Sequence, residues 1–255
     1  KYGIDVLWIG ARSTANPFTV QEIAQSLKGT NIPVLIKNPI HADLQLWIGA
    51  IERVHKSGIK KIAAIHRGFH FYGKTKYRNK PLWQMPIELK THFPSLQIIC
   101  DPSHISGNTS LIPDISQKAL DLGFDGLMLE VHSDPSKALS DSEQQLNHKQ
   151  FGDLISKLIY RDKNSLSEKA RNELFQLRRI IDEIDEDILN QLKRRLHVIE
   201  KIGKYKRKHN ITIFQLERWQ EILRTRGQLG DKLGISRQHI ERICQLLHEE
   251  SIRIQ

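Results

Sequence analysis

Short apolar runs alternate with longer amphipathic stretches over the first 160 residues. Five runs have the composition of buried strands: VLWIGAR, VLIKN, KIAAIHR, IICDPSH and GLMLEVH. The stretches between them, such as FTVQEIAQSL, LQLWIGAIERVHKSG and SLIPDISQKALDLG, have the spacing of amphipathic helices. Near-continuous apolar strands separated by helices predict a parallel sheet with right-handed crossovers.

The pattern changes after about residue 165. Apolar residues recur there in steps of three and four from Leu177 to Ile202, and the segment 164–209 contains no proline and a single late glycine. This spacing predicts one helix of roughly 40 residues, about 60 Å long, followed by two shorter helices around 214–229 and 236–254. A helix this long cannot bury its stripe in a small monomer, so we expect a homodimer through this part. We expect an α/β domain at 1–160, a linker at 161–166 and an all-helical domain at 167–255.

Composition and charge narrow the class of partner. The chain has 255 residues and no apolar run that could span a bilayer, and its first residues do not form a signal peptide. Two distant cysteines, Cys100 and Cys244, form no disulfide framework, which favours the cytoplasm. The net charge of +10 suits either nucleic acid or small anions. No helix-turn-helix, zinc-finger or RNP-like motif occurs, so we expect small anionic substrates and neither nucleic acid nor membrane.

A charged or ligating side chain follows each of the five predicted strands. In chain order these are Arg12, Lys37, Arg67, His104 and Glu130. In a β/α barrel the carboxyl ends of the strands open onto one mouth, where the chemistry takes place. Five such groups at one mouth predict a site.

The residue types indicate what that site binds. The three cations suit a substrate with phosphate and carboxylate groups, because arginine binds both anions bidentately. His104, Glu130 and Asp141, which ends an acidic segment, suit a divalent ion such as Mn, Fe, Co or Zn. On the residues alone, a metal site and a hydrogen-bonded His–Glu pair are about equally good interpretations.

Five motifs together carry a family resemblance: IGARSTANPF, PVLIKNP, HRGF, DPSHISG and DGLMLEVHSDPSKALSDSEQQL. In this order they resemble the type I 3-deoxy-D-arabino-heptulosonate 7-phosphate (DAHP) synthases, which are TIM barrels that condense phosphoenolpyruvate with erythrose 4-phosphate. The resemblance implies that Arg12 and Arg67 hold the phosphoenolpyruvate phosphate and that Lys37 lies against the same substrate. It also implies three ligands of a divalent metal: His104, Glu130 and Asp141.

The sequence departs from this family in two motifs. The Gly-Pro-Cys-Ser motif that supplies a fourth metal ligand and the Lys-Pro-Arg motif of the sugar-phosphate site do not occur. The resemblance begins near the family's fourth strand, so we expect the C-terminal part of a TIM (β/α)8 barrel without its first three units. Five strands of eight leave two open edges. We therefore expect a piece of a longer protein; a second chain that completes the barrel is the alternative.

Three cations of the helical half lie on two different faces of the predicted long helix. Arg195 and Lys206 lie eleven residues apart and share one helix face, whereas Arg178 is turned roughly 100° from that face. If the first two line one pocket, Arg178 serves another, for example across a dimer. Ser251 and Gln255, spaced i and i+4, project together.

The segments LRRIIDEID, KRRLHVIEKIGKYK and HEESIRIQ resemble the all-helical chorismate mutases of the AroQ class. These are intertwined homodimers that convert chorismate to prephenate without a cofactor. The resemblance implies that Arg178 enters the other subunit's site, and that the remaining site residues are Arg195, Lys206, Arg218, Ser251 and Gln255. The second helix begins Gln-Leu-Glu-Arg-Trp instead of the usual Asp-x-x-Arg-Glu, so the resemblance does not carry over the acidic contact to the substrate hydroxyl.

Together the halves predict a bifunctional DAHP synthase and chorismate mutase, with prephenate as a possible feedback effector of the barrel. There are two alternative enzymes. In the first, the chain is a chorismate mutase only, and its barrel portion is inactive or regulatory. In the second, the barrel is a 3-deoxy-manno-octulosonate 8-phosphate synthase and the helices are a dimerisation module. A catalytically inactive helical module and a nucleic-acid-binding protein are further alternatives.

Overall fold

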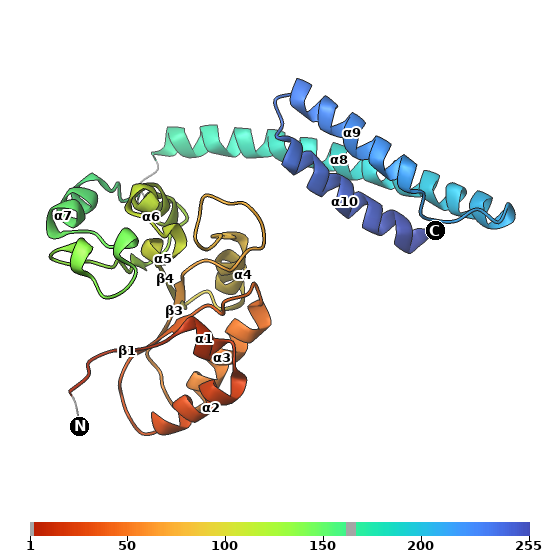
Figure 1. Cartoon of the computed structure of the whole chain (residues 1–255). Coiled ribbons are helices and arrows are strands. Elements are labelled where there is room, and N and C mark those ends of the chain that lie inside the picture. The colour runs from red at the N-terminus through yellow and green to blue at the C-terminus, as the bar shows by residue number, and fades with distance from the viewer. Residues whose placement is uncertain (1–2, 162–166) are drawn as a thin grey trace. The chain divides into compact units, whose positions relative to one another are not determined.

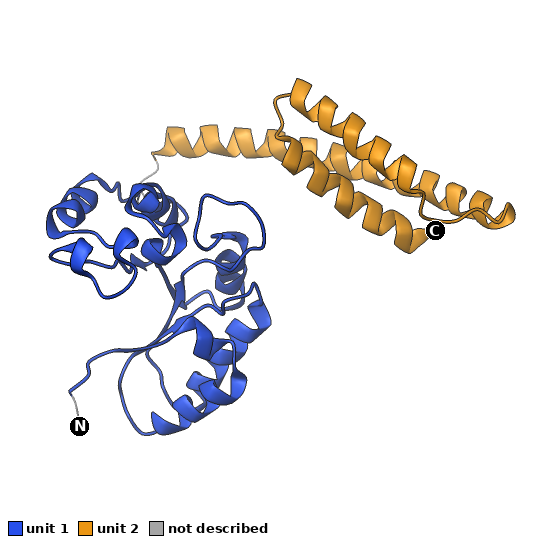
Figure 2. Ribbon diagram, viewed as in Figure 1, with its two compact units in different colours: residues 1–162 blue, residues 163–255 orange. Residues whose placement is uncertain are grey.

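The computed structural model describes residues 3–161 and 167–255, which belong to two compact units, 1–162 and 163–255 (Figure 2). All but one residue of the expected linker, 161–166, lies outside the described residues. No helix in the described ranges is long and apolar enough to cross a membrane.

Unit 1 is built on a parallel sheet whose strands lie side by side in chain order (Figure 1). The strands are β1 Leu7–Ile9, β2 Val34–Lys37, β3 Ile62–His66, β4 Gln97–Cys100 and β5 Gly126–Leu127. Every neighbouring pair is parallel. Chain order throughout means that each crossover advances the sheet by one strand, as in a β/α barrel. The five predicted strands and the parallel sheet are confirmed.

Helices connect these strands, and in the described part of unit 1 one further helix and two 3-10 turns follow β5. They are α1 Ala11–Thr14, α2 Pro17–Ser26, α3 Leu44–Lys56, α4 Gln84–His92, α5 Pro102–Ser106, α6 Ile112–Asp121 and α7 His148–Lys157, with 3-10 turns at Thr109–Leu111, Pro135–Lys137 and Ser142–Gln144. Side chains fix where several of them begin. Asn16 caps α2, which has proline in its first turn, and Asp43 caps α3.

Helix α3 shows how the amphipathic pattern builds the core of unit 1. Its buried residues Trp47, Ala50, Ile51 and Val54 repeat at helical spacing and form the face against the sheet. The indole Nε1 of Trp47 donates a hydrogen bond to the carbonyl of Ile36 in β2, at 3.2 Å. The pairing satisfies the one polar group of this large buried side chain and fixes α3 on the sheet.

Unit 2 consists of three helices, α8 Glu168–Lys208, α9 Leu216–Lys232 and α10 Arg237–Ile254. In this unit α9 and α10 lie along the C-terminal half of α8 (Figure 1). Glycines allow the close packing: a Cβ on Gly230 would lie 2.5 Å from Ile240 Cγ1, and a Cβ on Gly203 would lie 3.1 Å from the Cα of Gln255. The predicted long helix and the two shorter ones are confirmed.

The N-terminal half of α8 carries an exposed apolar stripe. Leu177, Ile181, Ile184 and Ile188 recur at helical spacing and are 61%, 56%, 48% and 52% exposed. Farther toward the C-terminus, α9 and α10 cover the same face of α8. Within the described part of unit 2, no helix covers the N-terminal half of α8, where these four residues lie.

Candidate active sites

The carboxyl ends of the strands in unit 1 bring a lysine and an aspartate together in a buried ion pair. Lys37 is the last residue of β2, and its Nζ lies 3.0 Å from Oδ2 of Asp101, which follows β4. Both side chains are almost completely shielded from water. Burial by itself would raise the pKa of Asp101, but hydrogen bonds and charge from His104, with the charge of Lys37, outweigh it and hold that pKa below its usual value. The carboxylate therefore stays ionised and fixed between two partners.

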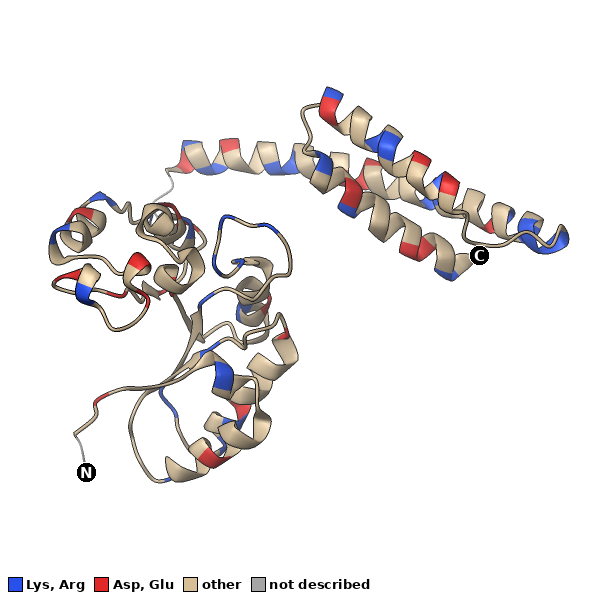
Figure 3. Cartoon of the chain, viewed as in Figure 1, with Lys and Arg blue, Asp and Glu red and all other residues tan. Residues whose placement is uncertain are grey.

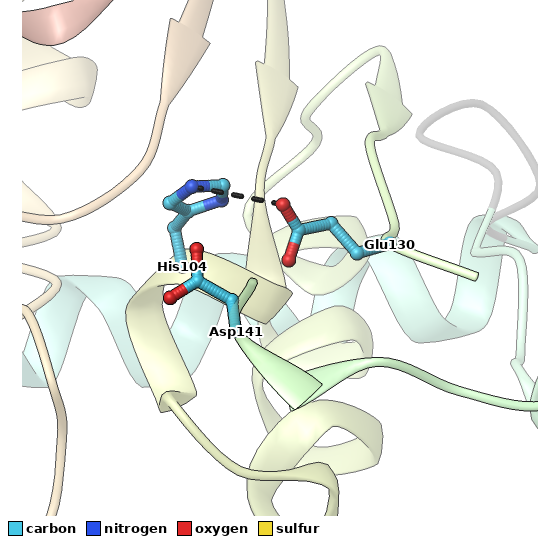
Figure 4. A group of neighbouring side chains, drawn as sticks. All are labelled: His104, Glu130 and Asp141. Carbon is cyan, nitrogen blue, oxygen red and sulfur yellow. Dashed lines mark ion pairs between the residues drawn. The ribbon is translucent and has the colours of Figure 1, made fainter. Parts of the chain in front are cut away.

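His104 lies one turn into α5, which Asp101 caps. Its Nδ1 is 2.9 Å from Asp101 Oδ2, so this nitrogen donates to the carboxylate and Nε2 is left with its lone pair. Nε2 faces Glu130, whose Oε1 is 3.8 Å away (Figure 4). The backbone N–H of Glu130 donates to Ser103 Oγ at 3.0 Å, which ties the segment after β5 to α5.

His104, Glu130 and Asp141 each offer one ligand atom, and these atoms lie within 4.8 Å of one another (Figure 4). An imidazole with two carboxylates is a donor set that Mn, Fe, Co or Zn accepts. The carboxylate behind the imidazole, from Asp101, is the arrangement that orients histidine ligands in metal sites. The residues therefore fit a divalent metal, and the structure brings together the three residues that the sequence singled out.

The two arginines of the predicted phosphate site lie at the same mouth. Arg67 follows β3, and Arg12 is in α1, just after β1. Burial lowers the pKa of Arg67, and the positive charges of Arg78 and Arg12 act in the same direction while Asp101 opposes them. Positive charge is therefore concentrated around Arg67, which favours an anionic ligand there.

Several residues that support this site were not among the sequence candidates. Asn79 accepts a hydrogen bond from Arg67 NH1 at 3.3 Å and donates from Nδ2 to the carbonyl of His104 at 2.7 Å. Asn38 accepts from the backbone N–H of Arg67 at 2.7 Å. Asn38 directly follows β2, so its position at a strand end was a usable signal. Asn79 lies in a loop, and no local pattern marks it.

His66, the last residue of β3, is a buried histidine beneath the mouth. Its ring lies among those of Phe69, Trp83 and Phe124, at centroid distances of 5.8, 5.3 and 6.1 Å. Within the described residues, neither ring nitrogen has a side-chain hydrogen-bond partner. Burial lowers its pKa from 6.5 to about 3, so this histidine is neutral at physiological pH.

His66 makes unit 1 sensitive to acid. Between pH 6.5 and about 3 the unfolded chain binds a proton that the folded chain excludes, so stability falls as the pH drops through this range. We expect His66→Leu to remove up to about 1.4 kcal/mol per pH unit of this loss. Urea unfolding at pH 7 and pH 5, followed by tryptophan fluorescence in a Trp219→Phe background, reports on unit 1. Equal pH dependence in both proteins would contradict the assignment.

Unit 2 contains a cavity of about 470 Å³ between its helices. Five of the six sequence candidates for the helical half line it: Arg195, Lys206, Arg218, Ser251 and Gln255. The sixth, Arg178, is exposed on α8 and does not line the cavity. Arg178 lies seventeen residues before Arg195, about 25 Å away along α8, so its assignment stays a prediction.

The cavity is strongly cationic. Arg226 lines it together with the three predicted cations, and no Asp or Glu belongs to its described lining. Arg195 NH1 donates to the carbonyl of Leu247 at 3.1 Å and Lys206 Nζ to that of Ile213 at 2.6 Å, which leaves further N–H donors on both. Such a cavity suits a small ligand with more than one negative charge.

The wall of this cavity differs from the expected family pattern at Trp219. Its ring stacks on that of His248 from α10, with centroids 4.3 Å apart. The pair joins α9 to α10 and forms an aromatic side of the cavity. Sequence reasoning missed Arg226, which belongs to no motif, and His248, which begins the segment HEESIRIQ but was not singled out. Only the packing of α9 on α10 brings both to the cavity.

The comparisons with known proteins match the two parts of the chain to two different families. Residues 2–166, more than half of the chain, match the DAHP synthetase I family. The chain belongs to this family. Residues 177–255 match the chorismate mutase type II family, so the chain also carries a chorismate mutase domain. Both resemblances drawn from the sequence are confirmed.

One curated relative and one solved structure similar to the DAHP synthase domain are from Thermotoga maritima. Phospho-2-dehydro-3-deoxyheptonate aldolase of this organism is 33% identical over 155 residues, which make up 60% of this chain and 44% of the relative. A solved truncated form of 3-deoxy-D-arabino-heptulosonate 7-phosphate synthase from Thermotoga maritima aligns with a TM-score of 0.53 at 30% identity. The alignment covers 60% of this chain and 56% of that one. Unit 1 therefore has the fold of part of a DAHP synthase barrel.

The mutase domain is similar to part of another fused enzyme. The bifunctional chorismate mutase/prephenate dehydratase of Buchnera aphidicola subsp. Schizaphis graminum is 33% identical over 86 residues, 34% of this chain and 22% of that protein. The chain thus spans less than half the length of these curated relatives.

Proposed function

We propose that this chain contributes to two reactions of aromatic biosynthesis, the condensation of phosphoenolpyruvate with erythrose 4-phosphate and the rearrangement of chorismate to prephenate. The observation that carries the proposal is the cationic cavity of unit 2, which gathers five family-matched residues in a chain that also belongs to the DAHP synthetase I family. Both reactions act on small anions, which accounts for the charge of +10. Both cysteines are free, which favours the cytoplasm.

The mutase reaction needs a cavity of this kind. The rearrangement is unimolecular, so its acceleration comes from holding the dianion in a reactive conformer and stabilising charge in the transition state. Arg195 and Arg218 hold carboxylates, and Lys206 and Gln255 donate to the ether oxygen as its bond breaks. The side-chain oxygen of Gln255 is buried and has no hydrogen-bond partner among the described residues. Because that oxygen can only accept, the donor to the ether oxygen is Nε2 of the same amide.

Arg195 has a matched control in its neighbour. Arg194 is exposed, does not line the cavity and donates to Gln191. We expect Arg195→Ala to lower kcat/KM for chorismate by about 100-fold or more, because a buried charged contact to the transition state is lost. Arg194→Lys, which keeps the positive charge at this position, is expected to stay within about twofold of wild type. The measurement is loss of chorismate absorbance. A fully active Arg195→Ala protein would exclude the cavity as the mutase site.

A homodimer accounts for the exposed stripe of α8. The stripe is continuous with the face that lines the cavity, so a second copy of α8 can cover its first half. An antiparallel pair centred near Leu189 brings Arg178 of one chain beside residue 200 of the other, between Arg195 and Lys206. The same register sets the acidic run 182–187 against the basic run 193–195. The charge match therefore favours this register.

Subunit complementation tests this arrangement. Arg178→Ala and Arg195→Ala are each expected to be nearly inactive alone. In a mixed dimer one cavity has both arginines and the other has neither, so equal co-expression should restore about a quarter of wild-type activity. Chorismate turnover by the copurified mixture measures this. If activity is not restored, while each variant still forms a dimer by sedimentation, Arg178 does not act across the interface.

In unit 1 the residues of the mouth bind and orient substrate. Arg12 and Arg67 hold the phosphate of phosphoenolpyruvate, and Lys37, fixed by Asp101, lies against the same molecule. His104, Glu130 and Asp141 would hold a divalent metal, which when bound acts as a Lewis acid on the sugar aldehyde. Charges of both signs thus meet at one mouth, cations for the phosphate and carboxylates for the metal.

One experiment on the 255-residue chain measures the mutase and synthase activities side by side. We expect chorismate turnover but no phosphate release from phosphoenolpyruvate and erythrose 4-phosphate with Mn²⁺. The physical reason is that the described sheet has open edges at β1 and β5, and that the sequence lacks the metal-binding Gly-Pro-Cys-Ser and sugar-binding Lys-Pro-Arg motifs. A colorimetric phosphate assay run beside the chorismate assay measures both. Phosphate release would show that five strands suffice or that another chain completes the site.

A further inference from the structure

Gln144 is a buried amide that touches one of the carboxylates of the triad. It ends the 3-10 turn Ser142–Gln144 and is 1% exposed. Its Nε2 donates to Glu130 Oε2 at 2.6 Å, and its Oε1 accepts from Arg78 NH1 at 2.7 Å. Glu130 therefore has one oxygen held by Gln144, while the other, Oε1, faces His104 Nε2. The amide therefore fixes the orientation of the Glu130 carboxylate toward the triad.

Arg78 connects this amide to a second carboxylate of the triad. Its NH1 also donates to Asp141 Oδ1 at 2.7 Å, so one guanidinium joins Asp141 to Gln144. Gly107 makes room for Arg78: it has a φ of +72°, and a Cβ there would lie 2.5 Å from the Cβ of Arg78. The backbone N–H of Arg78 donates to the carbonyl of Ser106 at 3.2 Å, which anchors the arginine beside α5.

Electrostatics explains why the carboxylates need such a support. Glu130 and Asp141 place ligand oxygens within 4.8 Å of each other, where two negative charges repel. The cation of Arg78 and the amide N–H of Gln144 offset that repulsion and hold both groups in place. A site assembled in this way does not have to order its ligands when a cation arrives.

We propose that Gln144, itself fixed by Arg78, is a positioning residue of the metal triad. It orients Glu130 so that Oε1 faces the same point as His104 Nε2, and Arg78 links that orientation to Asp141. The role rests on the metal centre of the proposed function and adds two residues to it. Both act through the carboxylates, and neither is a ligand.

The test measures metal affinity rather than activity. Gln144→Met keeps the volume of the side chain and removes both hydrogen bonds. We expect it to raise the Kd for Mn²⁺ by about 10- to 100-fold, measured by the electron paramagnetic resonance of free Mn²⁺ with the 255-residue chain. Arg78→Lys keeps the charge but loses the planar fork of donors, so a smaller, several-fold increase is expected. Because its charge is unchanged, this variant separates positioning from simple electrostatic attraction.

Gln117 provides the matched control. Its amide also donates to a carboxylate, Asp121, at 2.9 Å and pairs with the backbone of Ile159, but it belongs to α6 and not to the network around the triad. Gln117→Met should leave the Kd for Mn²⁺ unchanged. Unaltered Mn²⁺ affinity in Gln144→Met, or an equal loss in Gln117→Met, would overturn the positioning role alone. A wild-type chain that does not bind Mn²⁺ would overturn the metal centre as well.

Discussion

The mouth of unit 1 depends on one buried carboxylate. Asp101 caps α5, pairs with Lys37 of β2 and holds Nδ1 of His104, so a single side chain joins two strands, a helix and a candidate metal ligand. Removing either partner would leave a charge in a nearly dry environment, which is far more costly than losing a surface ion pair. The Asp-Pro-Ser-His sequence after β4 therefore does two tasks. The aspartate builds the support, and the turn that follows aims the histidine.

Unit 2 uses a single helix face for two purposes. The stripe of α8 lines the cavity where α9 and α10 cover it and is exposed farther toward the N-terminus. A continuous apolar stripe on a straight helix can serve both as core and as interface, because helical spacing is the same in either setting. Lys and Arg gather at the C-terminal end of this helix (Figure 3), where the helix dipole favours positive charge.

The charged side chains are arranged differently in the two candidate sites. In unit 1 cations and carboxylates lie side by side, and each carboxylate of the triad has a donor that limits its repulsion of its neighbours. In unit 2 the described lining of the cavity contains cations and no Asp or Glu side chain. The first arrangement suits a metal together with an anion, and the second suits an anion alone. The proposed reactions differ in the same way, since only one of them involves a metal.

Sequence by itself determined the elements, because buried strands and amphipathic helices leave local patterns that do not depend on distant residues. The strand-end residues Lys37, Arg67, His104 and Glu130 could also be named, since parallel strands bring their carboxyl ends to one edge of the sheet. Asn79, Arg78 and Gln144 could not be named in this way. They lie in loops far from their partners in sequence, and only the closing of those loops over α5 brings them together. The same holds for His66, whose displaced pKa comes from three rings gathered by tertiary packing. Local pattern fixes secondary structure and strand-end chemistry, while the support of each functional group is a contact between distant segments that the packed chain alone decides.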